Sequence, residues 1–292
     1  MTVSRVRDWF SLVKFSHSVF ALPFALISAL IAAGGLPPWR TTGFVCLCAV
    51  AARTAAMSFN RLVDRDLDAE NPRTRARELV RGALSARSVV LVVVLASAAF
   101  VAGAYVLNPL AGRLSWPCLV VLLGYSFAKR VTFLAHALLG LALALAPLGA
   151  WVAVRGSLAG DLSPPLLLAG AVLLWVVGFD LIYACQDADF DRRRGLHSVP
   201  ARFGVARALQ VSTVLHMGTV LLLSAFALRA ELGVFFFATL VLAAGLLVWQ
   251  HRIVSPSDLS RVDLAFFTLN GWVGIGLFAG CFLDVMTMGD VV

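Results

Sequence analysis

Long apolar stretches separated by short polar segments dominate this sequence. A helix that crosses a bilayer needs about 20 apolar residues, and nine stretches of that kind can be placed along the chain. The pattern therefore predicts an all-α, polytopic membrane protein with nine transmembrane helices in one domain, residues 1–292. The predicted spans are residues 17–35, 41–60, 88–107, 114–128, 134–154, 164–187, 208–228, 232–250 and 264–283.

The composition supports membrane insertion. Of the 292 residues, 60% are hydrophobic and only 14% are charged, whereas soluble domains carry roughly 25% charged residues. All five cysteines fall within predicted spans and none has the spacing of a zinc site. We therefore expect the cysteines to be small apolar packing residues.

The distribution of basic residues predicts how the chain is oriented. Most of the 24 lysines and arginines fall in loops on the side of the N-terminus, and the other side carries only Arg40, Arg113, Arg155 and Arg229. Because cytoplasmic loops are enriched in basic residues, we expect a cytoplasmic N-terminus and an external C-terminus. The net charge of +8 favours contact with anionic membrane lipid or phosphates, and no feature indicates a nucleic-acid partner.

The acidic residues are concentrated in two short segments, each at the cytoplasmic end of a predicted span. In the first segment, Asn60, Asp64 and Asp68 are four residues apart. Since four residues advance a helix by only about 40° beyond a full turn, these three side chains share one face. Asp66 points elsewhere. The segment therefore predicts a stripe of oxygen ligands.

A second stripe follows the sixth span. Asp180, Tyr183, Asp187 and Asp191 share a face, whereas Asp189 does not. Two carboxylate stripes at one membrane depth would repel each other unless a cation lies between them. Oxygen ligands select hard ions, and Mg²⁺ commonly binds a few carboxylates together with substrate phosphates. We therefore predict a Mg²⁺ site between the stripes.

Basic residues accompany both stripes. Arg73 and Arg77 follow the first stripe, residues 192–194 follow the second, and Lys129 with Arg130 ends the fourth span. Guanidinium groups bind oxyanions through paired hydrogen bonds. The combination predicts a metal–diphosphate site at the cytoplasmic face of the membrane.

The two acidic motifs resemble those of the UbiA superfamily of membrane-embedded prenyltransferases. That family carries N-x-x-x-D-x-x-x-D and D-x-x-Y-x-x-x-D-x-x-x-D, and both stand complete here at residues 60–68 and 180–191. The likeness extends to the leader, residues 14–25, and to residues 147–151. It implies nine helices around a central cavity that opens to lipid, in a bacterial-type inner (plasma) membrane with the active site on the cytoplasmic side.

The resemblance also implies roles for particular residues. The implied metal ligands are Asn60, Asp64, Asp68, Asp187 and Asp191. The implied catalytic residues are Asp64, Asp187, Asp191, Tyr183 and Asp180. The residues implied to contact the diphosphate are Arg53, Arg73, Arg77 and Lys129.

The implied activity is Mg²⁺-dependent transfer of a polyprenyl group from its diphosphate to an aromatic acceptor in quinone biosynthesis. Residues 56–61 and 71–74 resemble both enzymes that prenylate 4-hydroxybenzoate and a sister group that prenylates a 1,4-dihydroxy-6-naphthoate. The acceptor is therefore an aromatic carboxylate of either type. Tyr183 or a carboxylate of the second stripe would remove the ring proton.

Other functions fit the sequence less well. An ion-coupled secondary transporter would place its carboxylates near the middle of the bilayer. A lipid-alcohol phosphotransferase would need an upstream Asp-Gly pair, which is absent before Ala52 and Arg53. A UbiA-type enzyme with a different acceptor also fits. His17 is a candidate for acceptor contact or an interfacial role, and Asn270 is expected to bond a neighbouring helix.

Overall fold

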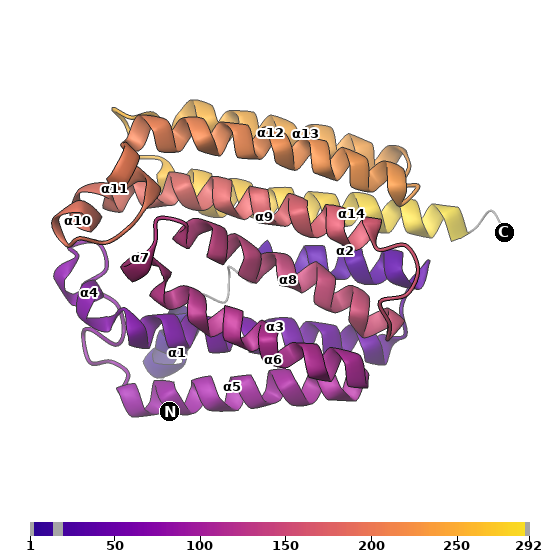
Figure 1. The fold of residues 1–292 in the computed structure, drawn as a ribbon, viewed down its shortest axis with the longest axis horizontal. Coiled ribbons are helices and arrows are strands. Elements are labelled where there is room, and N and C mark those ends of the chain that lie inside the picture. The colour runs from indigo at the N-terminus through magenta and orange to yellow at the C-terminus, as the bar shows by residue number, and fades with distance from the viewer. Residues whose placement is uncertain (1–2, 14–19, 290–292) are drawn as a thin grey trace.

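A computed structural model of the chain describes residues 3–13 and 20–289, and every extended element within these ranges is a helix (Figure 1). The helices are α1 (Val3–Val13), α2 (Leu22–Ala33), α3 (Trp39–Val63), α4 (Arg65–Glu70), α5 (Ala86–Leu107), α6 (Pro109–Gly124), α7 (Ala128–Val131), α8 (Ala135–Arg155), α9 (Ser163–Ala184), α10 (Ala188–Arg193), α11 (Val199–Phe203), α12 (Val205–Arg229), α13 (Val234–Ile253) and α14 (Asn270–Gly289). Short helical turns join α6 to α7 and α9 to α10, and a π-helical segment, Leu264–Leu269, precedes α14.

Eight helical segments are long and apolar enough to cross a membrane, which confirms an all-helical, multi-pass membrane protein. The first predicted span coincides with α2, whose 12 residues would extend only about 18 Å, against a hydrocarbon core of about 30 Å. Part of that predicted span lies outside the described residues. Nine membrane crossings therefore stay a prediction.

Helix α9 occupies the centre of the bundle. It is the most buried of the eight spans and packs against α8 on one side and α12 on the other. Its sequence is apolar on all faces, as expected for a helix surrounded by other helices. Trp175 and Phe179 of α9 are 1% and 2% exposed and anchor the largest apolar cluster. Because α9 is held on several sides, the second acidic stripe at its end is fixed in position.

Buried polar side chains connect the helices inside this apolar bundle. Ser28 of α2 donates to the Pro147 carbonyl at 2.6 Å, and Ser212 of α12 donates to the Gly178 carbonyl at 2.7 Å. The Trp175 indole donates to the Asn270 side chain at 2.8 Å. This contact confirms that Asn270 bonds a neighbouring helix. Such bonds hold transmembrane helices together where the hydrophobic effect is weak.

The polar elements gather at one end of the bundle. In Figure 1, α4, α7, α10 and α11 lie at the left-hand end, whereas α14 ends at the opposite end. The helix walls between the two ends present large apolar side chains, among them Val120 at 71% and Leu221 at 70% exposure. This surface suits a lipid environment, because exposed apolar side chains are unfavourable in water and are solvated by lipid chains in a bilayer.

The contact between α8 and α9 yields a test of the packing. A Cβ at Gly140 would lie 2.7 Å from Val177 Cγ2 and 2.9 Å from the Leu173 carbonyl oxygen. We therefore expect Gly140→Ala to destabilise the protein by about 1–3 kcal/mol through overpacking, seen as a lower thermal midpoint in detergent. Gly245→Ala is the matched control, since a Cβ there meets no atom within 4 Å. Equal midpoints for the two variants would contradict this packing.

Candidate active site

A polar cavity of about 620 Å³ opens at the end of the bundle that carries α4 and α10. All the site residues predicted from the sequence line it. They are Arg53, Asn60, Asp64, Asp68, Arg73, Arg77, Lys129, Asp180, Tyr183, Asp187 and Asp191. The structure thus brings together residues from α3, α4, α7, α9, α10 and the intervening loops.

The first stripe crosses the junction between α3 and α4. Asp64 ends α3, and hydrogen bonds from Asp64 N to Asn60 O and from Asp68 N to Asp64 O carry the helical pattern through the junction. The stripe therefore stays on one face, and the Asn60 amide donates to the Asp64 carboxylate at 3.0 Å. Asp66 is exposed to solvent, as the spacing predicts.

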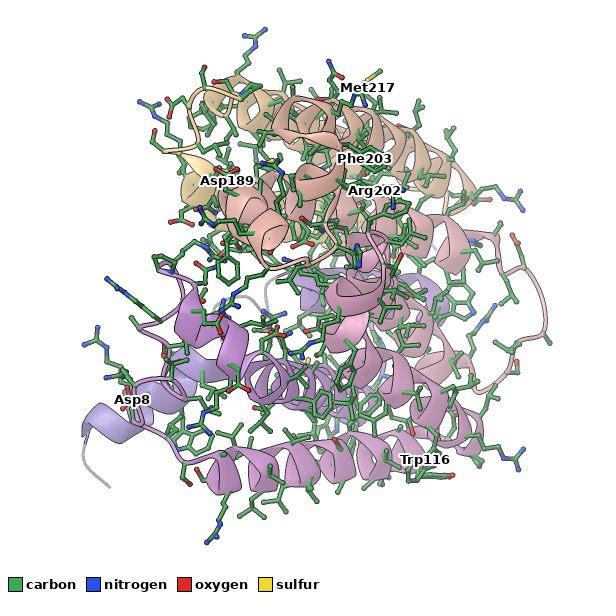
Figure 2. The ribbon with its side chains drawn as sticks, turned by 60° about the vertical axis from the view of Figure 1, so that its left-hand side comes forward. Asp8, Trp116, Asp189, Arg202, Phe203 and Met217 are labelled. Carbon is green, nitrogen blue, oxygen red and sulfur yellow. The ribbon has the colours of Figure 1, made fainter. Side chains whose placement is uncertain are left out.

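The second stripe crosses a short 3₁₀ turn, Cys185–Asp187, between α9 and α10. Asp187 and Asp191 are buried, at 6% and 2% exposure. The Asp189 side chain is 81% exposed and lies on the outer surface of α10, where Figure 2 labels it. Although the backbone changes from α-helix to 3₁₀ helix here, the Asp187 side chain still lines the cavity.

Arg73 joins the two halves of the site. It follows the first stripe in sequence, yet its guanidinium forms a fork with both carboxylate oxygens of Asp187, with Nε 2.9 Å from Oδ1. A second donor, Nη1, reaches the Tyr183 hydroxyl at 2.7 Å. Burial lowers the pKa of Arg73, but the hydrogen bond and charge of Asp187 outweigh burial, so the pKa is raised. The Asn71 amide also donates to Asp187 at 3.0 Å.

Three further carboxylates of the stripes, Asp64, Asp68 and Asp191, also have cationic partners. Arg77 Nη1 lies 2.6 Å from each oxygen of Asp68. Lys129 Nζ lies 3.8 Å from Asp191 Oδ2, and Arg130 Nη2 lies 3.4 Å from Asp64 Oδ1. The predicted repulsion between the stripes is therefore offset by four basic side chains. Three of these, Arg73, Arg77 and Lys129, are among the four residues expected to contact a diphosphate; the fourth is Arg53.

The donor atoms fit a hard divalent cation. Burial, followed by the negative charge of Asp68, raises the pKa of Asp64, while Lys129 and Arg130 act in the opposite direction. Asp191 Oδ2 is buried and accepts no hydrogen bond. Among residues 3–13 and 20–289, no three His, Cys, Asp or Glu side chains converge on one point. A cation here would need oxygens from another molecule, as Mg²⁺ obtains from phosphates.

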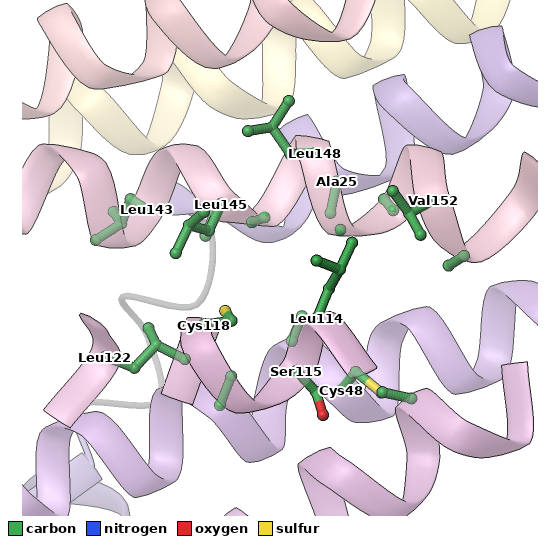
Figure 3. A pocket seen from close by; sticks show the side chains of 18 of the residues that line it. Ala25, Cys48, Leu114, Ser115, Cys118, Leu122, Leu143, Leu145, Leu148 and Val152 are labelled. Atoms are coloured by element: carbon green, nitrogen blue, oxygen red, sulfur yellow. The ribbon is translucent and has the colours of Figure 1, made fainter. Parts of the chain in front are cut away.

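An apolar cavity of about 520 Å³ adjoins the polar one (Figure 3). Cys48 and Ser115 lie on one side, and Leu145 and Leu148 of α8 lie on the other. Arg53 lines both cavities, and its Nε is buried without a hydrogen-bond partner. A cationic group thus stands at the boundary between the polar and the apolar space.

Aromatic side chains form a wall beside the second stripe. The Tyr183 ring lies over Phe266 with centroids 4.3 Å apart, and Phe267 meets it edge-on at 5.9 Å. The π-helical segment Leu264–Leu269 places both phenylalanines there. Its distorted backbone is satisfied locally, because the Asn270 amide donates to the carbonyls of residues 265 and 266. Such π-helical turns are often found at functional sites.

Sequence reasoning missed several residues of this site. Arg61 lines the cavity and is 5% exposed, and the sequence motifs did not single it out. His136 pairs with Asp180 from 44 residues away, a separation that no local motif could reveal. The phenylalanines of the π-helical segment carried no pattern that separated them from lipid-facing residues. His17 lies outside the described residues.

Fold and site together define a helical membrane protein with a carboxylate-rich, basic cavity beside an apolar one. Residues 21–272 match the model of the UbiA prenyltransferase family. The chain is similar to the 4-hydroxybenzoate octaprenyltransferase of Nitrosospira multiformis, with 34% identity over 88% of this chain and 87% of that protein. The corresponding protein of Ectopseudomonas mendocina is 33% identical over 96% and 94% of the two chains. The chain belongs to the UbiA prenyltransferase family.

Solved structures agree with this assignment. A UbiA homolog from Aeropyrum pernix K1, solved in its apo form, superposes with a TM-score of 0.82 at 35% identity, covering 94% of this chain and 98% of that one. A UbiA homolog from Archaeoglobus fulgidus, bound to GPP and Mg²⁺, superposes with a TM-score of 0.73 at 20% identity over 96% and 99% of the chains. The second likeness supports the fold.

Cation binding at the stripes should depend on pH. Metal ions bind deprotonated carboxylates, so Mn²⁺ affinity measured with inorganic diphosphate present should fall as the pH is lowered through the raised pKa of Asp64. The fall should begin above the ordinary Asp value of about 4. Asp64→Asn should weaken Mn²⁺ binding and flatten this dependence. Asp66→Asn, on the exposed face, should leave both unchanged, and identical effects of the two substitutions would rule out the stripe as the ligand set.

Proposed function

We propose that the protein transfers a polyprenyl group from its diphosphate to an aromatic acceptor of the 4-hydroxybenzoate or 1,4-dihydroxy-6-naphthoate type, in quinone biosynthesis. One observation carries the proposal: a cavity lined by both acidic stripes and six basic residues adjoins an apolar cavity, and Arg53 lines both. A prenyl diphosphate has the same two parts, one anionic and one apolar. The names of the relatives support an aromatic carboxylate as acceptor.

The diphosphate would bind at the stripes together with Mg²⁺. Asn60, Asp64 and Asp68 would hold the metal from the first half of the chain, and Asp187 and Asp191 from the second. When bound, Mg²⁺ neutralises negative charge on the diphosphate as the bond to the prenyl carbon breaks. The donor set fits, because all the ligands are oxygens and Asp191 Oδ2 accepts no hydrogen bond.

The basic residues would change partners when the diphosphate binds. Arg73 now forms a forked contact with Asp187, and Arg77 contacts both oxygens of Asp68 through Nη1. A guanidinium fork fits a phosphate as well as a carboxylate. Once the carboxylates coordinate a cation, the two guanidinium groups and Lys129 are free to bind the diphosphate oxygens. Arg53 would add positive charge where the apolar cavity begins.

The prenyl chain would occupy the apolar cavity, away from water. Cleavage of the C–O bond leaves an allylic cation, which the aromatic wall of Tyr183, Phe266 and Phe267 would stabilise through the ring faces. An electron-rich acceptor ring then attacks this carbon. The acids lie at one end of the bundle, whereas a transporter would carry them midway along its spans. We therefore favour an enzyme over a transporter.

The same end of the bundle would face the cytoplasm of a bacterial inner membrane. Residues 192–194 and Arg202 add to the positive charge beside the site, and all four are exposed. Positive charge of this kind favours the cytoplasmic side. The C-terminus lies at the opposite end (Figure 1) and would be external.

A prenyl-transfer assay tests the proposed activity. Membranes containing the protein, Mg²⁺ and a long-chain prenyl diphosphate should convert either 4-hydroxybenzoate or 1,4-dihydroxy-6-naphthoate into a prenylated product. Chelation of the metal, Asp64→Ala and Asp187→Ala should each abolish product formation, because charge on the leaving diphosphate is then uncompensated. Asp189→Ala, on the exposed face of α10, is the matched control. Folded protein that forms no product with either acceptor would refute the proposal.

The apolar cavity should limit the length of the prenyl chain. Cys118→Trp adds a large side chain to the cavity wall, so turnover of a long-chain prenyl diphosphate should fall at least tenfold, the effect of losing about 1.4 kcal/mol. Geranyl diphosphate should be affected much less. Val120 lies two residues away on the exposed face, so Val120→Trp should leave turnover of both substrates unchanged. An equal loss with both substrates in Cys118→Trp would place the chain elsewhere.

A further inference from the structure

Asp180 of the second stripe differs from its neighbours in the kind of partner it has. Asp187 and Asp191 face Arg73 and Lys129. Asp180 instead accepts a hydrogen bond from the imidazole of His136, with Nδ1 and Oδ2 2.6 Å apart. The Asp180 side chain is 17% exposed and lines the polar cavity, whereas the His136 side chain is 2% exposed behind it.

The surroundings determine which nitrogen of His136 carries the proton. The backbone N–H of Val199 points at His136 Nε2 from 3.5 Å, and an N–H can only donate. Nε2 therefore accepts, and in the neutral ring Nδ1 is protonated and donates to Asp180. The contact holds one carboxylate oxygen in place, and the other, Oδ1, has no hydrogen-bond donor among residues 3–13 and 20–289. His136 acts here as a positioning residue.

The position of Asp180 along α9 suits contact with the acceptor ring. It lies seven residues before Asp187, which corresponds to about 10 Å along a helix. Arg53 precedes Asn60 by the same number of residues on α3. Asp180 therefore lies deeper than Asp187 along α9 and lines the polar cavity, whereas Arg53 and Tyr125 line both cavities. Asp180 interacts electrostatically with Tyr125, which places it near the junction of the two cavities. The bond between prenyl chain and acceptor has to form at this boundary.

The other candidate bases are less suited to this step. The Tyr183 side chain is a phenol whose hydroxyl already carries a proton, and its oxygen accepts a hydrogen bond from Arg73 in this structure. Asp187 and Asp191 are the ligands proposed for the metal. The titratable groups that face Asp180 are His136 of α8, Lys129 of α7 and Tyr125 of the turn before it. Lys129 is paired with Asp191, and Tyr125, as a phenol, is protonated at neutral pH.

We propose that Asp180, held by His136, removes the proton from the acceptor ring. This inference rests on the proposed prenyl transfer. The C–O bond of the prenyl diphosphate breaks and the electron pair leaves with the diphosphate. The ring then forms a C–C bond to the allylic carbon, and the ring carbon transfers its proton to Asp180 Oδ1, which restores the aromatic ring. The carboxylate later returns the proton to water, so atoms and charge balance.

Ring deuteration tests this role directly. With Mg²⁺, geranyl diphosphate and saturating 4-hydroxybenzoate, the wild-type protein should turn over ring-deuterated and ordinary acceptor at the same rate, because proton removal is fast. In Asp180→Asn, turnover should fall by about 10²–10⁴-fold, the typical contribution of a general base, and the deuterated acceptor should react more slowly. An isotope effect appears only if proton removal limits the rate, which a structural defect would not produce.

Variants of His136 provide a second measurement in case Asp180→Asn is inactive. His136→Ala should reduce turnover by roughly 10- to 100-fold through loss of a hydrogen bond to a charged group and should show the isotope effect. His136→Asn, whose amide can occupy the place of Nδ1–H, should recover part of the rate and reduce the effect. His216→Asn is the matched control, since His216 is 2% exposed and pairs with His251 rather than with a cavity residue.

The outcomes separate this inference from the proposed function. Product from the wild-type protein, with no isotope effect in any Asp180 or His136 variant that turns over, would refute the role of Asp180 and leave prenyl transfer intact. An isotope effect in His216→Asn would refute it as well, because the effect would then follow from general disturbance. No product from the wild-type protein would refute the proposed function itself.

Discussion

Carboxylates buried at the end of a membrane bundle need compensating charge, and this constraint organises the polar half of the molecule. Removing an ionised group from water costs several kcal/mol unless it is paired, and Asp68, Asp187 and Asp191 are each less than 8% exposed. Arg77, Arg73 and Lys129 provide that charge. The contact between Arg73 and Asp187 matters most, because it joins the loop after the first stripe to the helix of the second.

The same ion pairs would allow the charged side chains to exchange partners when a ligand binds. The contacts of the cavity are ion pairs between flexible basic side chains and fixed carboxylates, and the carboxylates are fixed because α9 is enclosed by α8 and α12. A ligand that carries both anionic oxygens and a divalent cation could pair with both sets of groups. Its oxygens would pair with the basic side chains, and its cation with the carboxylates. The residues proposed for the metal–diphosphate site are therefore close together and paired with opposite charges in this structure.

Depth along the bundle separates the chemical roles. The stripes lie at the polar end, Asp180 lies deeper along α9, and Arg53 lines both the polar and the apolar cavity. The aromatic wall from the π-helical segment lines the polar cavity beside the second stripe. In the proposed binding mode, the anionic head of a prenyl diphosphate would lie in the polar cavity and its apolar tail in the apolar cavity. The reactive carbon would lie between them.

The sequence by itself determined the membrane class, the approximate spans and the faces of the two acidic stripes, because hydrophobicity and residue spacing are local properties of a helix. Asp66 and Asp189 point away from the site as the spacing requires. Tertiary structure alone decided the partners. Arg73 meets Asp187 across 114 positions and His136 meets Asp180 across 44, and the apolar cavity exists only between packed helices. Such contacts depend on how distant helices pack, which no local pattern encodes.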